Sequence, residues 1–394
     1  MRVALAALLL AALVGVPVGP AVAAGCSTPK GVYTGQTPWA QKLVDPARIW
    51  PLTTGSGVTV AVVGTGVDPG NAQFDQARIL PMIDLLPGGG GSAPDCDGRG
   101  TFDAGIIAAQ ADPTTTVAGV APGARILPIR YAESTTDSAG QGGAPDALAG
   151  AIDRAVNAHA SVILIGVPAV TDSGALDTSV ANALAAGDVI VSPASSTQAG
   201  APSYPTASRG VLAVGAVNES GGAVQTESGP YLSIAAPGAN LVSTSAGAGG
   251  KLGHTWPVQD PSFAAAYVAG TVALLRSYRP DLTPAQVATR LTLTASRPAG
   301  GGYDSHLGWG VVDAYAAVSA TLPADAAGPG VAPVVVPNAV VPAARVAASA
   351  SPYRWVGIGA VLAVLVAVLI AIVAVMVRRG RARGWRLGRL PSLR

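Results

Sequence analysis

Six short runs of almost uninterrupted apolar residues constrain the fold of this chain more than any other feature. A strand that is apolar at nearly every position is typical of a parallel sheet with both faces covered, because neither side of such a strand meets water. The runs cover residues 58–63, 126–131, 161–167, 189–191, 211–217 and 232–235. The sequence therefore predicts strands of a buried parallel sheet at these six places.

Helical periodicity lies between the runs. Two stripes of small and aliphatic side chains recur at helical spacing, one before the run at 161 and one before the run at 189. They consist of Leu148, Ile152 and Ala155 within residues 145–158, and of Val180, Ala181, Leu184 and Ala185. Strands that alternate with helices predict an α/β fold, in which helices flank a parallel β-sheet and the crossovers are right-handed.

The first residues have the pattern of a secretory signal peptide. Arg2 is followed by an apolar run over residues 3–18 and then by small residues at 21–24, which suit a cleavage site. We therefore assign residues 1–23 to a signal peptide. An uncleaved N-terminal anchor is the alternative, but the apolar run is short for a bilayer span.

The end of the chain predicts one C-terminal transmembrane helix at residues 355–377. Residues 356–377 are 22 consecutive uncharged residues, which as a helix would be about 33 Å long and would cross a hydrocarbon core of roughly 30 Å. Residues 378–394 hold seven Arg and no acid, so the positive-inside rule places this basic tail in the cytoplasm and the preceding residues outside. A buried helix of a soluble domain is the alternative interpretation.

Between these signals the sequence predicts an N-terminal extension (24–50), a main domain (51–320) and a linker (321–354). The linker is rich in Pro, Ala, Val and Gly and suits an extended spacer to the membrane. Residues 24–355 hold 16 Lys and Arg against 22 Asp and Glu, a net charge of −6. A nucleic-acid-binding domain needs a basic face, so we expect no nucleic acid among the partners.

The two cysteines, Cys26 and Cys96, both lie in the part predicted to be exported. Oxidising conditions there favour a disulfide between them. Lipidation of Cys26 after signal cleavage is the alternative, and it would leave Cys96 unpaired. Two cysteines without further ligands do not make a zinc site, and we expect neither a metal nor a cofactor.

Several motifs of the main domain closely resemble those of the mycosins, the membrane-anchored subtilisin-like serine proteases of actinobacterial type VII secretion systems. The matching segments are residues 38–52 (PWAQKLVDPARIWPL), 55–63 (GSGVTVAVV), 95–98 (DCDG), 100–101 (GT), 104–109 (AGIIAA), 203–207 (SYPTA), 235–241 (AAPGANL), 262–265 (SFAA) and 308–314 (GWGVVDA). The resemblance covers residues 24–320 and implies a subtilisin-like fold. The predicted signal peptide, linker, membrane helix and basic tail complete the layout of that family.

The chemistry of the family needs a serine nucleophile, a histidine base, a carboxylate that orients the histidine, and an amide that stabilises the oxyanion. The resemblance places the aspartate position at Gly64 and the histidine position at Arg99. The oxyanion asparagine corresponds to Ser196, or to Ser195 if the loop shifts, and neither carries an amide side chain. Only Ser262, at the nucleophile position, keeps the residue of the family.

The substitutions around Ser262 oppose acyl transfer. Arg99 cannot act as a base, because its guanidinium stays protonated at physiological pH. Pro261 lacks a backbone N–H, and Asp260 brings a carboxylate beside the place where an oxyanion would form. We expect Arg99 to form a structural ion pair with Asp97 or Asp103 instead.

Other polar residues have simpler expected roles. His159 is expected to end a helix and to interact with its dipole, and His306 to lie in a surface loop. Asp68 and Asp103 lie near the lost aspartate and histidine in sequence, and a replacement role for them is the alternative; Asp68 is expected in a turn before Pro69, and Asp103 in the first turn of a helix.

The resemblance and the lost residues together predict a catalytically inactive mycosin. It would act as a structural or stabilising component of a type VII secretion membrane complex, and its vestigial cleft could hold a peptide segment. One alternative is an active serine endopeptidase that uses Ser262 with a displaced base, for which His254 is the candidate. Another is a drifting paralogue that retains no partner.

Overall fold

The computed structural model describes most of the predicted main domain and a few residues near the C-terminus. It covers residues 26–29, 31–88, 93–133, 143–196, 200–225, 227–255, 259–298, 300–322, 375–376 and 378–379. The chain divides into two units, residues 1–333 and 334–394, and the description below concerns the first. The predicted signal peptide, nearly all of the linker and of the membrane-helix region, and most of the basic tail lie outside the described residues. Among the described residues, none belongs to a helix that is long and apolar enough to cross a bilayer.

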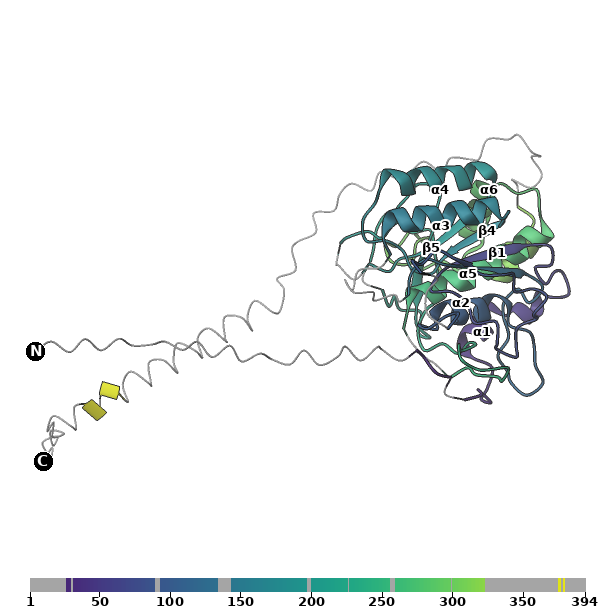
Figure 1. Ribbon diagram of the computed structural model, residues 1–394. Coiled ribbons are helices and arrows are strands. Elements are labelled where there is room, and N and C mark those ends of the chain that lie inside the picture. Colours follow the sequence, from purple (N-terminus) through teal and green to yellow (C-terminus); the bar gives the residue numbers. More distant parts are fainter. Residues whose placement is uncertain are drawn as a thin grey trace, which may run out of the picture. The chain divides into compact units, whose positions relative to one another are not determined.

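The centre of the domain is a parallel sheet in the order β2-β3-β1-β4-β5-β6-β7 (Figure 1). Its strands are β1 (Thr59–Gly64), β2 (Ile83–Asp84), β3 (Arg125–Arg130), β4 (Val162–Ile165), β5 (Val189–Pro193), β6 (Leu212–Val217) and β7 (Ile234–Pro237). All six predicted strands are present. The sequence analysis missed β2, which is only two residues long and half-buried.

Helices cover both faces of this sheet, as predicted. The helices are α1 (Trp39–Val44), η1 (Pro46–Arg48), α2 (Arg99–Ala108), α3 (Pro145–Asn157), α4 (Gly174–Ala186), α5 (Pro261–Tyr278), α6 (Pro284–Thr294) and α7 (Ala314–Ser319). The helices α3 and α4 pack on one face, and α2 and α5 on the other (Figure 1).

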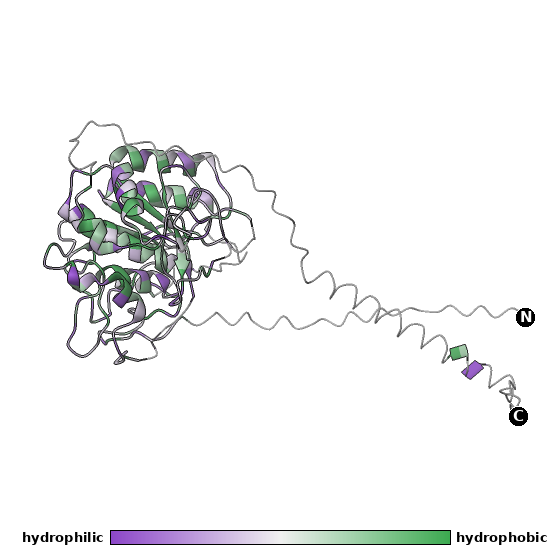
Figure 2. Ribbon diagram, turned by 180° about the vertical axis from the view of Figure 1, so that it is seen from behind, coloured by the Kyte–Doolittle hydropathy of each residue, from purple (hydrophilic) through white to green (hydrophobic). Residues whose placement is uncertain are grey.

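Alternation along each strand explains why the predicted strands are apolar throughout. In β1, Val60 and Val62 join the core cluster that contains α2 and α5, whereas Ala61 and Val63 join the cluster that contains α3 and α4. Successive side chains of a strand point to opposite faces, so a strand covered on both faces must be apolar at every position. Figure 2 shows these hydrophobic strands at the centre, with hydrophilic residues on the outer sides of the helices.

The order of the strands marks one end of β1 as the place for a site. The chain builds β2 and β3 on one side of β1 and β4 to β7 on the other, so the crossovers diverge at β1. In open α/β sheets, ligands bind at the carboxyl ends of the strands beside such a switch point. Gly64 is the residue at that end of β1, and it pairs in register with Arg130 of β3.

A disulfide attaches the N-terminal arm to the domain. Cys26 and Cys96 are bonded to one another, 70 residues apart in sequence, which confirms the predicted pair. Ser27 adds a backbone hydrogen bond to the carbonyl of Cys96, 2.8 Å long. The alternative, a lipidated Cys26, does not agree with this bond.

Candidate active site

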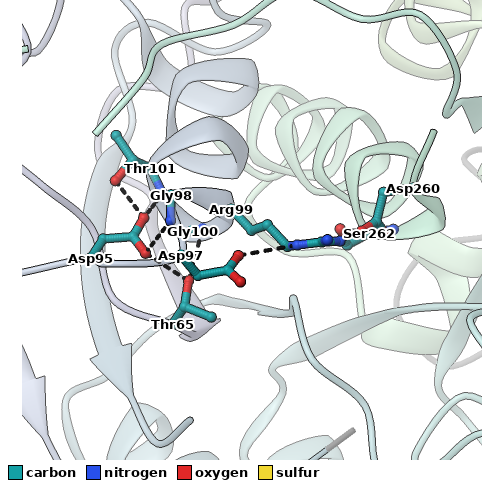
Figure 3. A network of polar contacts seen from close by, with 9 residues as sticks. All are labelled: Thr65, Asp95, Asp97, Gly98, Arg99, Gly100, Thr101, Asp260 and Ser262. Carbon is teal, nitrogen blue, oxygen red and sulfur yellow. Dashed lines mark hydrogen bonds and ion pairs between the residues drawn. The ribbon is translucent and has the colours of Figure 1, made fainter. Parts of the chain in front are cut away.

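The three residues that sequence analysis placed at the catalytic positions come from three elements that meet at the switch point. Gly64 is the last residue of β1, Arg99 is the first of α2, and Ser262 is the second of α5. The two helices pack tightly, with the rings of Phe102 and Phe263 centred 4.3 Å apart. The fold thus brings the beginnings of both helices to the end of β1 (Figure 3).

Two glycines allow α2 to begin this close to β1. A Cβ at Gly100 would lie 1.9 Å from the carbonyl oxygen of Gly66, so only glycine fits there. Gly66 itself has φ +101°, in the region that favours glycine. The close approach sets the position from which the Arg99 side chain starts.

Ser262 is part of the N-terminal cap of α5. Asp260 is the N-cap residue, and its Oδ1 accepts hydrogen bonds from the backbone N–H of Ser262 at 2.8 Å and from the Ser262 hydroxyl at 2.9 Å. Pro261 occupies the first helical position, where its missing N–H costs nothing. Ser262 is 1% exposed. Its hydroxyl donates a hydrogen bond to the carboxylate that caps the helix.

Arg99 extends from the start of α2 to the cap of α5 (Figure 3). Its Nη1 forms an ion pair with Oδ2 of Asp260, and its Nε lies 3.1 Å from Oδ1 of Asp97. The pair with Asp97 confirms one of the two expected partners. The pair with Asp260 was not expected, because the two residues are far apart in sequence and no local pattern connects them. Asp260 therefore bridges Arg99 and Ser262.

The loop before α2 is organised by the buried carboxylate of Asp95. It accepts hydrogen bonds from the Thr65 hydroxyl (2.9 Å), the Gly98 N–H (2.8 Å), the Thr101 N–H (2.7 Å) and the Thr101 hydroxyl (2.6 Å). Burial raises the pKa of Asp95, and these donors act in the opposite direction. The four bonds fix the residues on both sides of Cys96 and hold the start of α2 beside β1.

Asp103 does not lie where the sequence analysis placed it. It was expected in the first turn of a helix, but α2 begins at Arg99 and holds no acid in its first turn. Asp103 lies one turn further on and is 1% exposed. Its Oδ1 has no hydrogen-bond partner within the described part of the chain. Burial raises the pKa of this carboxyl well above its usual range, while the positive charge of Arg99 acts against that shift.

His254, the candidate for a displaced base, is occupied elsewhere. Its Nδ1 accepts the backbone N–H of Tyr33 at 3.3 Å, and its Nε2 pairs with Oε1 of Gln73. Because Nδ1 is an acceptor, the proton of the neutral ring lies on Nε2 and is donated to Gln73. Burial lowers the pKa of His254 to about 4. One ring nitrogen therefore binds the N-terminal arm, and the other binds Gln73 of the main domain.

Three other expectations concern turns and helix ends. His159 follows the C-cap of α3 in the left-handed conformation, with φ 57°, so it lies at a helix end as expected. Asp68 lies in a turn, as expected, and accepts the N–H groups of Gly70 and Gly247 at 2.8 and 2.6 Å. His306 lies in a half-buried loop, where Asp304 accepts its backbone N–H.

Ser196 follows β5 and is held by a residue that the sequence analysis missed. The buried carboxylate of Glu227 accepts the N–H of Ser196 at 2.7 Å, and it also accepts the N–H and the hydroxyl of Ser203 and the hydroxyl of Tyr231. Glu227 is 0% exposed, although no apolar pattern around it signals burial. Its position is determined by the tertiary structure.

Comparisons with known proteins agree with this architecture. The model of the subtilase family, Peptidase S8, matches residues 55–310. The chain is 34% identical over 340 residues to mycosin-1 of Mycobacterium tuberculosis, covering 73% of this chain and 74% of mycosin-1. A crystal structure of MycP1 without its N-terminal propeptide superimposes with a TM-score of 0.64 at 32% identity, over 73% of this chain and 98% of MycP1.

A further match is a chain in the structure of the periplasmic assembly from the ESX-5 inner membrane complex. It has a TM-score of 0.63 and 28% identity, and the match covers 76% of this chain and 87% of that one. The sheet and helices have the subtilisin-like arrangement, and the three motif residues gather at the end of β1. Because its relatives are this similar, the chain belongs to the mycosin family of subtilisin-like proteases.

Proposed function

We propose that this mycosin does not hydrolyse peptides and that it is a structural, stabilising component of a type VII secretion membrane complex. The observation that carries the proposal is the Arg99–Asp260–Ser262 bridge. A guanidinium takes the position that the resemblance assigns to the family's base, and the serine hydroxyl is bound to a helix-capping carboxylate.

The missing base decides the chemistry. A serine hydroxyl near neutral pH is a weak nucleophile unless a neighbouring group accepts its proton. In subtilisin, a relative of this chain, loss of the catalytic histidine alone lowers turnover by about a million-fold. Arg99 cannot replace that histidine, since it has no lone pair to accept a proton. Gly64 supplies no carboxylate, and Ser196 supplies no side-chain amide.

A structural role fits the family and the predicted layout. The similar chain in the ESX-5 periplasmic assembly supports membership in an inner-membrane complex. In this proposal, residues 24–320 lie on the periplasmic side, residues 321–354 form a spacer, the helix at 355–377 anchors the chain in the membrane, and residues 378–394 remain in the cytoplasm. The partners are other components of that complex, and the vestigial cleft can hold one of their peptide segments.

A fluorophosphonate probe tests the absence of activity. Such a probe labels a serine only if the hydroxyl is activated, so we expect no labelling of the wild-type protein. An active mycosin is the positive control, and the Ser262→Ala variant is the matched negative control. Labelling of the wild type that disappears in Ser262→Ala would support the alternative, an active endopeptidase with a displaced base.

Complementation of a deletion strain tests the structural role. Ser262→Ala should restore assembly of the secretion complex as well as the wild type does, because the hydroxyl performs no catalysis. A chain without residues 356–377 should not restore it. If the complex assembles normally in the deletion strain itself, the protein has no stabilising role.

A further inference from the structure

Asp103 is a buried acid that lies beside the site and takes part in none of the hydrogen bonds described above. It lies on α2 four residues after Arg99, so both side chains project from the same face of the helix. Its Oδ1 has no partner among the described residues, although the side chain is 1% exposed. A buried carboxyl oxygen without a hydrogen bond is costly, and such groups are common at functional sites.

The position of the Asp103 carboxyl is fixed by the strand ends beneath it. A Cβ at Gly166 would lie 3.0 Å from Oδ2 of Asp103. Gly166 directly follows β4, and its N–H donates to the carbonyl of Val63 at 2.8 Å. The carboxyl therefore lies over the adjoining ends of β1 and β4, next to Gly64, which has no side chain.

We propose that Asp103 has taken the place of the triad carboxylate, so that it would orient an imidazole at position 99 toward Ser262. This inference rests on the proposed function, since it concerns a site that has lost its base. In a serine triad the carboxylate accepts the Nδ1–H of the imidazole and thereby fixes its tautomer and direction. The free Oδ1 of Asp103 is an acceptor of this kind, one helical turn from position 99.

The course of the Arg99 side chain shows the direction in which an imidazole at position 99 would extend. It starts beside Asp103 and ends at Asp260, whose other oxygen binds the Ser262 hydroxyl. Position 99 thus lies between the orphaned carboxyl and the serine. In contrast, Asp97 pairs with Arg99 from the loop before α2 and is more exposed, so it makes a matched control for charge alone.

The first experiment measures the pKa of the introduced imidazole by NMR on the full-length chain with labelled histidine. The Arg99→His variant adds one titrating signal to those of the three native histidines. Adding Asp103→Asn should lower the pKa of the new signal by about one unit or more, because in this proposal it removes the carboxylate that accepts the imidazole N–H from one helical turn away. Adding Asp97→Asn should change it by less than half as much. An equal effect of the two substitutions, or none, would overturn the proposal.

A rescue variant tests whether the effect of Asp103→Asn comes from the loss of a carboxylate at this position or from a general disturbance of the fold. A Cβ at Gly64 would meet Val167 Cγ2 at 3.7 Å, an ordinary contact, so an acid can be introduced there. If Asp103 occupies the triad position, Gly64→Asp should restore the imidazole pKa in the Arg99→His, Asp103→Asn background. Failure of this rescue in a folded variant would count against a shared position.

The second experiment measures probe labelling of Ser262. The variant Arg99→His with Asp260→Gly provides a base and frees the hydroxyl from its present acceptor. Labelling forms a bond from Ser262 Oγ to phosphorus, breaks the P–F bond, releases fluoride to solvent and transfers the hydroxyl proton to the imidazole. Adding Asp103→Asn should slow labelling at least about tenfold. Equal labelling with and without Asp103, or none in a variant that folds, overturns the inference, whereas labelling of the wild type would instead overturn the proposed function.

Discussion

At the scale of single residues, Arg99 should contribute to the stability of the domain. Its side chain is 26% exposed and forms ion pairs with two carboxylates that come from different parts of the sequence. Replacing it by Met should lower the free energy of unfolding by about 1–2 kcal/mol, because Asp97 and Asp260 then each lose an ion pair with Arg99. Urea denaturation measures this. The control is Arg78→Met, whose pair with Asp75 is 38% exposed on both sides and should contribute less than about 1 kcal/mol. Equal losses for the two variants would contradict a special role of Arg99.

His254 gives the domain a pH dependence that a single substitution can remove. Burial lowers its pKa to about 4, whereas in the unfolded chain it titrates near 6.5. At this group the unfolded chain therefore binds more protons between these values, so the contribution of His254 to stability is complete above about pH 6.5 and falls as the pH drops toward 4. The loss should be on the order of 2 kcal/mol. His254→Gln should abolish it, as measured by urea denaturation at pH 7 and pH 4.5. The same pH dependence in His254→Gln as in the wild type would contradict the buried, neutral imidazole.

At the scale of elements, strands were easier to predict than the contacts at their ends. The apolar runs located every strand except β2, because burial on both faces leaves a direct pattern in the sequence. The central helix α5 begins at Pro261 and ends at Tyr278, and its last residues are less buried than the rest, so the apolar pattern fades before the helix ends. The partners of Arg99 and Ser196 are far away in sequence, so only the folded chain reveals Asp260 and Glu227 as these partners.

The ends of α4 and α5 meet at the start of β5, where Asp188 is 8% exposed. Arg276 of α5 donates to the carbonyl of Gly187, while Oδ2 of Asp188 has no partner within the described residues. Burial raises the pKa of Asp188 to about 6. The folded state then binds more protons than the unfolded chain between about pH 4 and 6, so this group costs stability as the pH rises through that window.

Asp188→Asn should therefore stabilise the domain at pH 7 by about 1–2 kcal/mol and leave its stability at pH 3.5 nearly unchanged. Thermal unfolding at the two pH values measures the difference. The effect has the opposite sign to that of His254, so adding His254→Gln should remove the two opposing contributions together. A loss of stability in Asp188→Asn at pH 7 would mean that the carboxylate is needed to balance Arg276.

At the scale of the whole domain, the N-terminal arm is attached at several points that are far apart in sequence. The disulfide holds Cys26 to Cys96, the carbonyl of Tyr33 accepts the hydroxyl of Thr115 at 2.7 Å, and its N–H reaches His254. The sequence analysis expected the disulfide because both cysteines follow an export signal. It could not predict the other contacts, since the residues around them carry no motif.

Removing the disulfide tests how much the domain depends on this arm. The Cys26→Ser, Cys96→Ser variant should lose about 2–4 kcal/mol of stability, because the bond closes a loop of 70 residues and restricts the unfolded chain. Calorimetry should give the same lowered Tm for this variant and for the wild type in reductant, and reductant should not change the variant further. Because Asp95 holds the start of α2 through bonds that do not involve sulfur, the Arg99–Asp260 pair should survive, and the variant should remain unlabelled by the fluorophosphonate probe. An unchanged Tm would mean that the hydrogen bonds of the arm alone attach it to the domain.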